Sequence, residues 1–307
     1  MKFYDIVVVG AGPAGMSASL NAENDGLDFK LVESEDAGWF PRVSVDSHYF
    51  VDNYLGFSNV SGTELIRNFA EHLRTNGIFS GKAKVETIER VGTDFFVHSD
   101  TGDYMSRSII LATGTRQKEL VVPGIERFLG NSVFYYCVPD GDRFVGKKVL
   151  VVGGRNTGAV TALYLNKLGC AVEVVEKDPQ LNAKNKYASR IIDGGIPFRV
   201  GTEIVMLKGG EKLEGATLKT PHGLEEIAAD GVFVCIGLEP NNSLAKNLGV
   251  SLNDWGYINV DKNMATSVQG IFAAGDITGG LKQIAVAVAQ GSIAAYNLSK
   301  YLSVKNG

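Results

Sequence analysis

Two short glycine turns, each set between an apolar strand and a helix-like stretch, constrain this chain more than any other feature of its sequence. The first is GAGPAG at residues 10–15, which follows the apolar run DIVVV, and the second is GGRNTG at residues 153–158, which follows KKVLVV. In each copy an acidic residue, Glu33 or Glu176, follows the first glycine by 23 positions. This repeated pattern predicts two βαβ units of the dinucleotide-binding kind.

The first turn has every part that such a site needs. Its first glycine makes the tight turn, its second lets the backbone approach a pyrophosphate, and its third lets the helix pack close to the strand. The unpaired N–H groups at the helix N-terminus face the phosphates, and the acid at the end of the next strand accepts hydrogen bonds from a ribose diol. The candidate contacts are Gly10, Gly12, Pro13, Ala14, Gly15 and Glu33.

The second turn departs from this pattern at one position. Arg155 stands where a glycine is needed for the approach of a pyrophosphate, so its Cβ would meet a nicotinamide cofactor bound in the usual pose. The negative charge of Glu176 disfavours the 2′-phosphate of NADPH and suits the free hydroxyl of NADH, although Lys177 and Lys184 could attract phosphate. Nicotinamide use therefore stays open here, with the candidate contacts Gly153, Arg155, Asn156, Thr157 and Glu176.

Each copy also ends alike, which sets the expected domain organisation. The apolar strands RSIILATG and DGVFVCIG both break at a glycine, and a long helix of small residues closes the chain. The pattern predicts an α/β fold with two Rossmann-like, three-layer dinucleotide-binding domains, the second inserted in the first. The expected boundaries are 1–115 and 241–307 for the first domain and 116–240 for the second.

Composition excludes several other classes of protein. The 30 basic and 34 acidic residues occur without a long run of one sign, so we expect no nucleic-acid partner and no membrane surface. The three cysteines lie too far apart for a metal site, and their odd number argues against a secreted disulfide framework. We therefore expect no metal and a location in the reducing cytoplasm.

Together these motifs resemble the low-molecular-weight thioredoxin reductases and the wider flavoprotein family with two dinucleotide-binding domains, over essentially the whole chain. The resemblance implies FAD in the first domain, an NAD(P)-binding-like second domain, and a homodimer joined mainly through the FAD domain. Further FAD contacts are implied in VDNYLGF, in ATG, in GIFAAGD and at the start of the last helix, whose positive end favours negative charge on the flavin ring. These residues are Asn53, Ala112, Thr113, Gly114, Gly275, Asp276, Lys282, Gln283 and Ile284.

The chain departs from the resemblance at the redox-active cysteines. Family members carry C-x-x-C before Asp-Gly, and aligning that pair on Asp140-Gly141 puts Tyr136 and Pro139 in the two cysteine positions. Cys137 falls beside the first of them, without a resolving partner, so we favour a packing role for it. The segment 38–50 is longer and more aromatic than the family's, and it contains Trp39, Phe40, Arg42, His48 and Tyr49. The catalytic group stays unassigned, with His48, Tyr136 and Cys137 as candidates.

Three functions remain open at this stage. The first is an FAD-dependent oxidoreductase that exchanges electrons with a partner such as ferredoxin and uses no dithiol relay. The second is a reductase of ferredoxin, free flavin, quinone or oxygen that is driven by NAD(P)H, with NADH favoured. The third is a non-catalytic redox sensor in which FAD is structural; the intact motifs at the flavin end argue against it.

Overall fold

The computed structural model describes residues 2–34, 50–135 and 140–305, and it divides into two compact units. The first unit comprises residues 1–116 and 239–307, and the second comprises residues 117–238. The chain crosses from one unit to the other through two short strands that pair with each other, β9 (Thr115–Gln117) and β18 (Leu238–Pro240). Each unit has its own sheets and its own buried clusters of apolar side chains.

The first unit is built on a seven-stranded sheet with a parallel centre. Its parallel strands lie in the order β5 (Gly81–Lys82), β2 (Phe29–Glu33), β1 (Lys2–Val9), β8 (Tyr104–Leu111) and β19 (Ile271–Ala273). The antiparallel strands β7 (Asp94–Ser99) and β6 (Val85–Val91) continue the sheet from the first half of β8. Strand β1 is buried on both faces, since Ile6 and Val8 enter one apolar cluster while Val7 and Val9 enter another. This explains its continuous apolar sequence.

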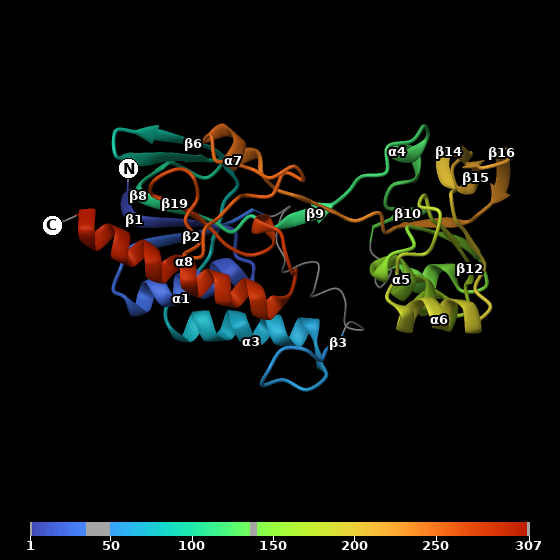
Figure 1. Cartoon of the computed structure of the whole chain (residues 1–307), viewed down its shortest axis with the longest axis horizontal. Coiled ribbons are helices and arrows are strands. Elements are labelled where there is room, and N and C mark those ends of the chain that lie inside the picture. The colour runs from blue at the N-terminus through green and yellow to red at the C-terminus, as the bar shows by residue number, and fades with distance from the viewer. Residues whose placement is uncertain (1, 35–49, 136–139, 306–307) are drawn as a thin grey trace. The chain divides into compact units, whose positions relative to one another are not determined.

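Two helices from opposite ends of the sequence lie side by side on one face of this sheet (Figure 1). They are α1 (Pro13–Asn24) and α8 (Ile284–Lys305). Ser17 Oγ donates to the carbonyl of Val288 at 2.7 Å, and a Cβ on Gly291 would lie 2.1 Å from the Ala14 carbonyl oxygen. The small residues of the last helix therefore allow the close approach that returns the C-terminal segment to the first unit.

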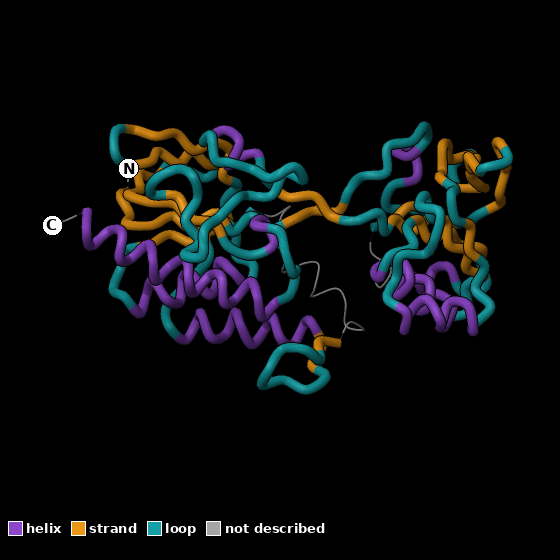
Figure 2. The backbone as a smooth tube through the Cα atoms, viewed as in Figure 1, coloured by secondary structure: helices purple, strands orange, loops and turns teal. Residues whose placement is uncertain are grey.

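Shorter elements complete the first unit. The hairpin β3 (Phe50–Val51) and β4 (Val60–Ser61) leads into α3 (Gly62–Thr75), whose first turn is capped by Ser61 Oγ accepting from the Glu64 N–H at 3.1 Å. The remaining elements are α7 (Ser243–Asn247) and the 3₁₀ turn η2 (Asp276–Thr278). Figure 2 shows how these helices and loops flank the strands.

The second unit repeats the parallel design in its own sheet. Its five parallel strands lie in the order β10 (Val133–Phe134), β17 (Gly231–Val234), β11 (Lys148–Val152), β12 (Ala171–Val175) and β13 (Phe198–Arg199). One face is covered by α5 (Asn156–Lys167), α6 (Asn185–Asp193) and the 3₁₀ turn η1 (Gly141–Phe144). The other is covered by α4 (Ile125–Phe128) and an antiparallel sheet of β14 (Glu203–Gly209), β15 (Leu213–Thr220) and β16 (Gly223–Ala228).

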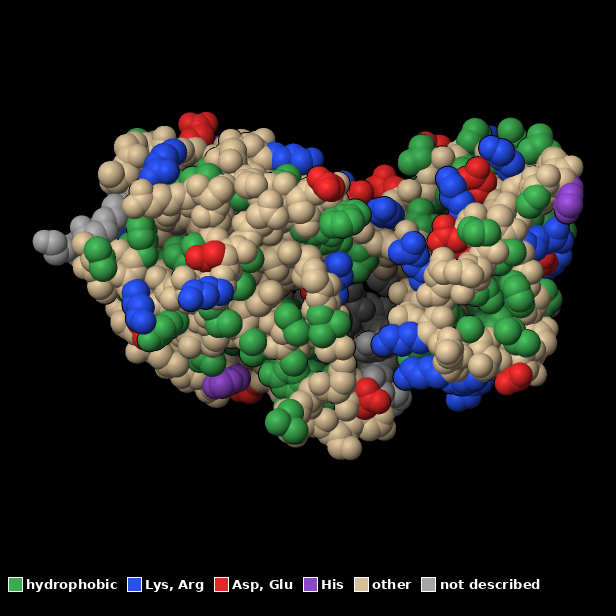
Figure 3. Space-filling model, in the orientation of Figure 1, with side chains coloured by type: hydrophobic (Ala, Val, Ile, Leu, Met, Phe, Trp, Pro, Cys, Tyr) green, Lys and Arg blue, Asp and Glu red, His purple; other side chains and the backbone are tan. Residues whose placement is uncertain are grey.

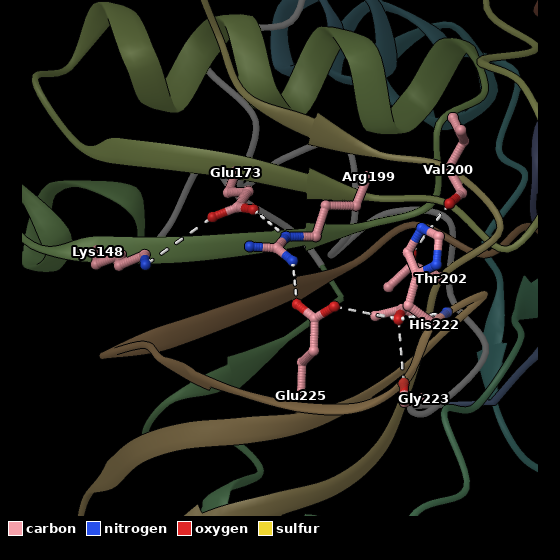
Figure 4. A network of polar contacts seen from close by, with 9 residues as sticks. Lys148, Glu173, Arg199, Val200, Thr202, His222, Gly223 and Glu225 are labelled. Carbon is pink, nitrogen blue, oxygen red and sulfur yellow. Dashed lines mark hydrogen bonds and ion pairs between the residues drawn. The ribbon is translucent and has the colours of Figure 1, made fainter.

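An arginine ties the parallel sheet of this unit to its antiparallel sheet (Figure 4). Arg199 on the edge strand β13 donates to Glu173 of β12 at 2.5 Å and to Glu225 of β16 at 2.7 Å. These hydrogen bonds, foremost the one to Glu173, raise the pKa of the Arg199 guanidinium above its ordinary value.

The predicted fold class is confirmed, because both units are three-layer α/β structures built on a βαβ core. The second unit lies between the two segments of the first in sequence, and the chain crosses a few residues after each predicted strand break. Within the described part of the chain, no helix is long and apolar enough to span a membrane.

Candidate functional site

A cavity of about 720 Å³ lies in the first unit where β1, β2 and β8 end. The carboxyl ends of parallel strands are the usual position for a ligand in such sheets. The structure brings together here most residues expected from the motifs, although they come from five separate segments of the sequence. The expected residues that line the cavity are Gly10, Gly12, Pro13, Ala14, Glu33, Asn53, Ala112, Thr113, Gly114, Gly275, Asp276, Lys282, Gln283 and Ile284.

The glycine turn supplies the floor of this cavity. Gly10 has φ +106°, and a Cβ there would lie 2.3 Å from the carbonyl oxygen of Ala112. Gly15 does not line the cavity; it lies under the turn, where a Cβ would be 1.8 Å from the Gly10 carbonyl oxygen. Both glycines are therefore required by contacts within the protein itself. Gly12 has φ −71°, which any residue adopts, so its missing side chain matters for the ligand instead.

Glu33 ends β2 at the edge of the cavity and is half-buried. Its Oε2 accepts a hydrogen bond from the Ala11 N–H at 2.5 Å, and its Oε1 has no partner among the residues that the structure describes. Burial raises the pKa of this carboxyl, and the backbone hydrogen bond from Ala11 partly opposes that rise. Within the described part of the chain, this second oxygen is therefore left to accept a hydrogen bond from a hydroxyl group of a ligand in the cavity.

Asp276 also lines the cavity, in the tight turn that precedes α8. Gln290, one of the residues that sequence analysis missed, holds this turn: its Oε1 accepts from the Gly275 N–H at 2.8 Å and from Thr278 Oγ1 at 3.2 Å. Burial raises the pKa of the Asp276 carboxyl, and the charge of Lys282 partly opposes the rise. The first residues of α8 also line the cavity, so the positive end of that helix faces it.

Asn241 is a second residue that the motifs did not reveal. Its side-chain amide donates to the Thr113 carbonyl at 2.8 Å, while Thr113 Oγ1 donates to the Asn241 carbonyl at 2.9 Å. This reciprocal pair holds the ATG segment against the returning chain. Lys84 and Arg116 also line the cavity, and Arg116 is paired with Glu239 at 2.6 Å. No motif signals Asn241, Lys84, Arg116 or Glu239, because these residues come together only through the fold.

The second glycine turn has the same backbone shape as the first. Gly153 has φ +111°, and a Cβ there would lie 2.3 Å from the Cys235 carbonyl oxygen. Arg155 has nearly the backbone conformation of Gly12; its side chain is 73% exposed and pairs with Asp178 at 3.5 Å. Glu176 is buried, and both of its oxygens accept backbone N–H groups, one from Gly154 and the other from Asp178.

Some expected residues lie outside the part of the chain that the structure describes. They are Tyr136, Cys137 and Pro139, and the aromatic segment that contains His48. The other two cysteines are buried in the second unit. Burial, and secondarily the charge of Asp142, raises the pKa of the Cys170 thiol, while Cys235 Sγ lies 3.5 Å from Thr161 Oγ1. These are features of packing cysteines rather than of reactive ones.

Comparison with known proteins agrees with this geometry. Residues 4–291 match the model of the pyridine nucleotide-disulphide oxidoreductase family. The chain is 33% identical to the "34.2 kDa protein in rubredoxin operon" of Clostridium pasteurianum, over 99% of both chains. It is also 33% identical to the crystal structure of T. acidophilum thioredoxin reductase, with a TM-score of 0.87 over 99% of this chain and 100% of that one. A ferredoxin-flavin thioredoxin reductase from Clostridium acetobutylicum is 30% identical, with a TM-score of 0.55 over 99% of each.

The chain therefore belongs to the pyridine nucleotide-disulphide oxidoreductase family, and within it to the proteins built like thioredoxin reductase. It is an FAD-dependent oxidoreductase. The cavity of the first unit fits this cofactor, because it combines a glycine turn at a helix N-terminus with a carboxylate that has one oxygen without a partner among the described residues.

Proposed function

We propose that this flavoprotein exchanges electrons with a small redox protein of the ferredoxin kind, and that no dithiol of its own takes part. The observation that carries the proposal is the set of cysteines. The 307 residues hold no C-x-x-C, and both cysteines within the described ranges are buried. A dithiol cycle needs an exposed thiolate with a resolving partner nearby, and this requirement is unmet by Cys170 and Cys235.

FAD, when bound, accepts two electrons, so two molecules of a one-electron carrier exchange electrons with each flavin. We assign its binding to the first unit. The first turn and Glu33 would hold the pyrophosphate and a ribose, Asp276 the ribityl chain, and the start of α8 the ring. Asn53 and the ATG segment would complete the cavity.

A basic face on the second unit supports a protein partner. Lys186 and Arg190 are exposed on α6, four positions apart, and neither has a carboxylate partner among the described residues. Lys184 at the start of that helix is exposed too. Figure 3 shows basic side chains gathered on this side of the second unit. Such a face attracts a small acidic carrier and raises the rate of encounter. The name of the Clostridium acetobutylicum neighbour also includes ferredoxin.

The alternative is a reductase that draws electrons from NADH. One observation favours it: the second glycine turn keeps its shape at Gly153 and Gly158. Anaerobic titration of the yellow holoprotein separates the two functions. We expect reduced ferredoxin to bleach the flavin absorbance, and NADH or NADPH to leave it unchanged over the same time. Rapid bleaching by a nicotinamide alone selects the alternative. If none of the donors bleaches the flavin, both functions are rejected.

A charge-reversal pair tests the docking face. We expect Lys186→Glu/Arg190→Glu to slow reduction by ferredoxin roughly tenfold at low salt, with less effect at high salt. Lys246→Glu/Lys262→Glu changes the net charge equally but lies in the first unit, and it serves as the control. Equal rates in the two variants would place the docking surface elsewhere.

We further propose a homodimer, and a reducing compartment such as the cytoplasm, where free cysteines persist.

A further inference from the structure

The segment that follows β12 folds back over the second glycine turn. Leu181 lies so close to Gly154 that a Cβ on that glycine would be 2.7 Å from Leu181 Cδ2. Leu181 is half-buried and packs against the apolar cluster beneath α5. The segment is therefore attached to the turn by a packed side chain as well as by polar contacts.

Polar contacts fix the same segment at both ends. At its start, Glu176 accepts the N–H groups of Gly154 and Asp178. At its end, the Lys184 N–H donates to Asn156 Oδ1 at 2.8 Å, and Asn156 is the first residue of α5. Between them, Asp178 accepts from Asn182 Nδ2 at 2.7 Å and pairs with Arg155. The Glu176 carboxylate, the Gly154 N–H and the Asn156 side chain are thus engaged by the chain itself.

Among the described residues, the two acids differ in their hydrogen bonds. At the first turn, Glu33 keeps one oxygen without a partner in the described structure and the turn faces a cavity, whereas at the second turn both oxygens of Glu176 are hydrogen-bonded within the protein. The acid that elsewhere receives a ribose hydroxyl is here part of the local backbone structure. Burial of Glu176 and these two backbone hydrogen bonds disfavour its use by the ribose of NADH, which was the expectation from the motif.

We infer that residues 177–184 occupy the place of the adenosine half of a dinucleotide, so that the second unit is closed to NADH and NADPH. The residues present do not fit a nicotinamide dinucleotide. A ligand must first displace Leu181 and break the Asn156–Lys184 hydrogen bond. Only the small fraction of molecules with the segment open can then bind it, and the apparent affinity is lowered in proportion to that fraction. Arg155 is a second obstacle, but it is not the one that closes the site. This inference concerns the second unit alone and holds whichever protein carrier the flavin uses.

Binding of ADP-ribose tests the inference without any assay of activity. This ligand carries the adenosine ribose and the pyrophosphate, and calorimetry on the holoprotein reports its affinity directly. We expect the wild-type protein to show no saturable binding of ADP-ribose or NADH up to about 1 mM. Saturable binding by the wild-type protein within that range overturns the inference.

A variant series separates the segment from Arg155. We expect Arg155→Gly alone to stay closed, and Arg155→Gly/Asn156→Ala/Leu181→Ala to bind ADP-ribose at least tenfold tighter than Arg155→Gly. A smaller difference between these two proteins overturns the inference. Arg155→Gly with Pro179→Ala/Gln180→Ala is the matched control, because residues 179 and 180 are exposed and make none of the contacts described above to the turn. Full FAD content and an unchanged melting temperature verify that each variant is folded.

Hydrogen exchange gives a measurement that needs no variant. The amides of Gly154, Asp178 and Lys184 are donors in the closed arrangement, so we expect them to exchange at least a hundredfold more slowly than unstructured amides. Exchange of the Lys184 amide at the rate of an unstructured chain would contradict the closed arrangement.

Discussion

Glu33 and Glu176 accept a hydrogen bond from the same position of their two glycine turns, from the N–H groups of Ala11 and Gly154. They differ in the second oxygen, which lacks a partner in Glu33 among the described residues and accepts from the Asp178 N–H in Glu176. Within the described residues, the two turns therefore have equal backbone shape but different hydrogen bonds at the acid. At the second turn, the additional donor belongs to the segment that follows the acid.

The equal backbone shape of Gly12 and Arg155 allows a reciprocal exchange of residues. We expect Gly12→Arg to fold, because φ is −71° at Gly12 and −87° at Arg155, but to lose FAD, because the side chain enters the path of the pyrophosphate. The loss of affinity should be at least about a hundredfold, measured by flavin absorbance after dialysis. Arg155→Gly is the control and should keep its colour. Full flavin occupancy in Gly12→Arg would contradict the assignment of the first turn.

Asp276 links flavin binding to stability. Burial raises its pKa, so the folded apoprotein retains this proton at pH values where the unfolded chain has lost it. The contribution of Asp276 to stability is therefore most favourable at acid pH, and it is lost as the pH rises through the raised pKa. We expect Asp276→Asn to raise the melting temperature of the apoprotein at pH 7 by roughly 2 °C, with a gain that shrinks as the pH falls.

The same substitution should weaken FAD. A neutral amide is a weaker hydrogen-bond acceptor than a carboxylate, so we expect the holoprotein to lose affinity by about tenfold. Asp254→Asn, at an exposed site, should change neither quantity. A substitution that stabilises the apoprotein but weakens FAD binding indicates a carboxylate that serves the ligand rather than the fold. A destabilised apoprotein would show instead that Asp276 supports the fold.

The sequence allowed the turn residues of the cavity to be predicted, because their spacing is dictated by local geometry. Gly10 must avoid the Ala112 carbonyl, and that requirement leaves a glycine at a fixed place after a strand. Asn241 and Gln290 could not be predicted in the same way. Asn241 acts across more than 100 residues, and Gln290 acts from α8 on the turn that precedes this helix, by hydrogen bonds that no short pattern encodes.

The environment of Glu176 was also beyond the sequence pattern, for a related reason. Its position at the end of a strand predicts a ribose acceptor, and that position is observed. Whether its oxygens are free depends on the path of the next eight residues, and Leu181 sets that path by packing into an apolar cluster below. Tertiary packing, rather than strand and turn propensity, decides the outcome there.

The first unit is where we expect two copies of the chain to meet. Light scattering should give a mass of about twice 32.9 kDa at micromolar concentration. If the two copies meet through the first unit, Lys186→Glu/Arg190→Glu should leave this mass unchanged, because both residues lie in the second unit. A single-chain mass at all concentrations would contradict the expected homodimer.

Cys137 gives the sharpest test of electron transfer without a dithiol. The alignment on Asp140-Gly141 puts Tyr136 and Pro139 in the thiol positions, and Cys170 and Cys235 are buried among apolar side chains. A thiol without a resolving partner cannot complete a disulfide cycle. We therefore expect Cys137→Ser to keep electron exchange with ferredoxin within about twofold of the wild-type rate. Loss of about a hundredfold, equivalent to roughly 2.7 kcal/mol of barrier, with unchanged FAD content and melting temperature, would make Cys137 a working thiol and overturn the proposed function.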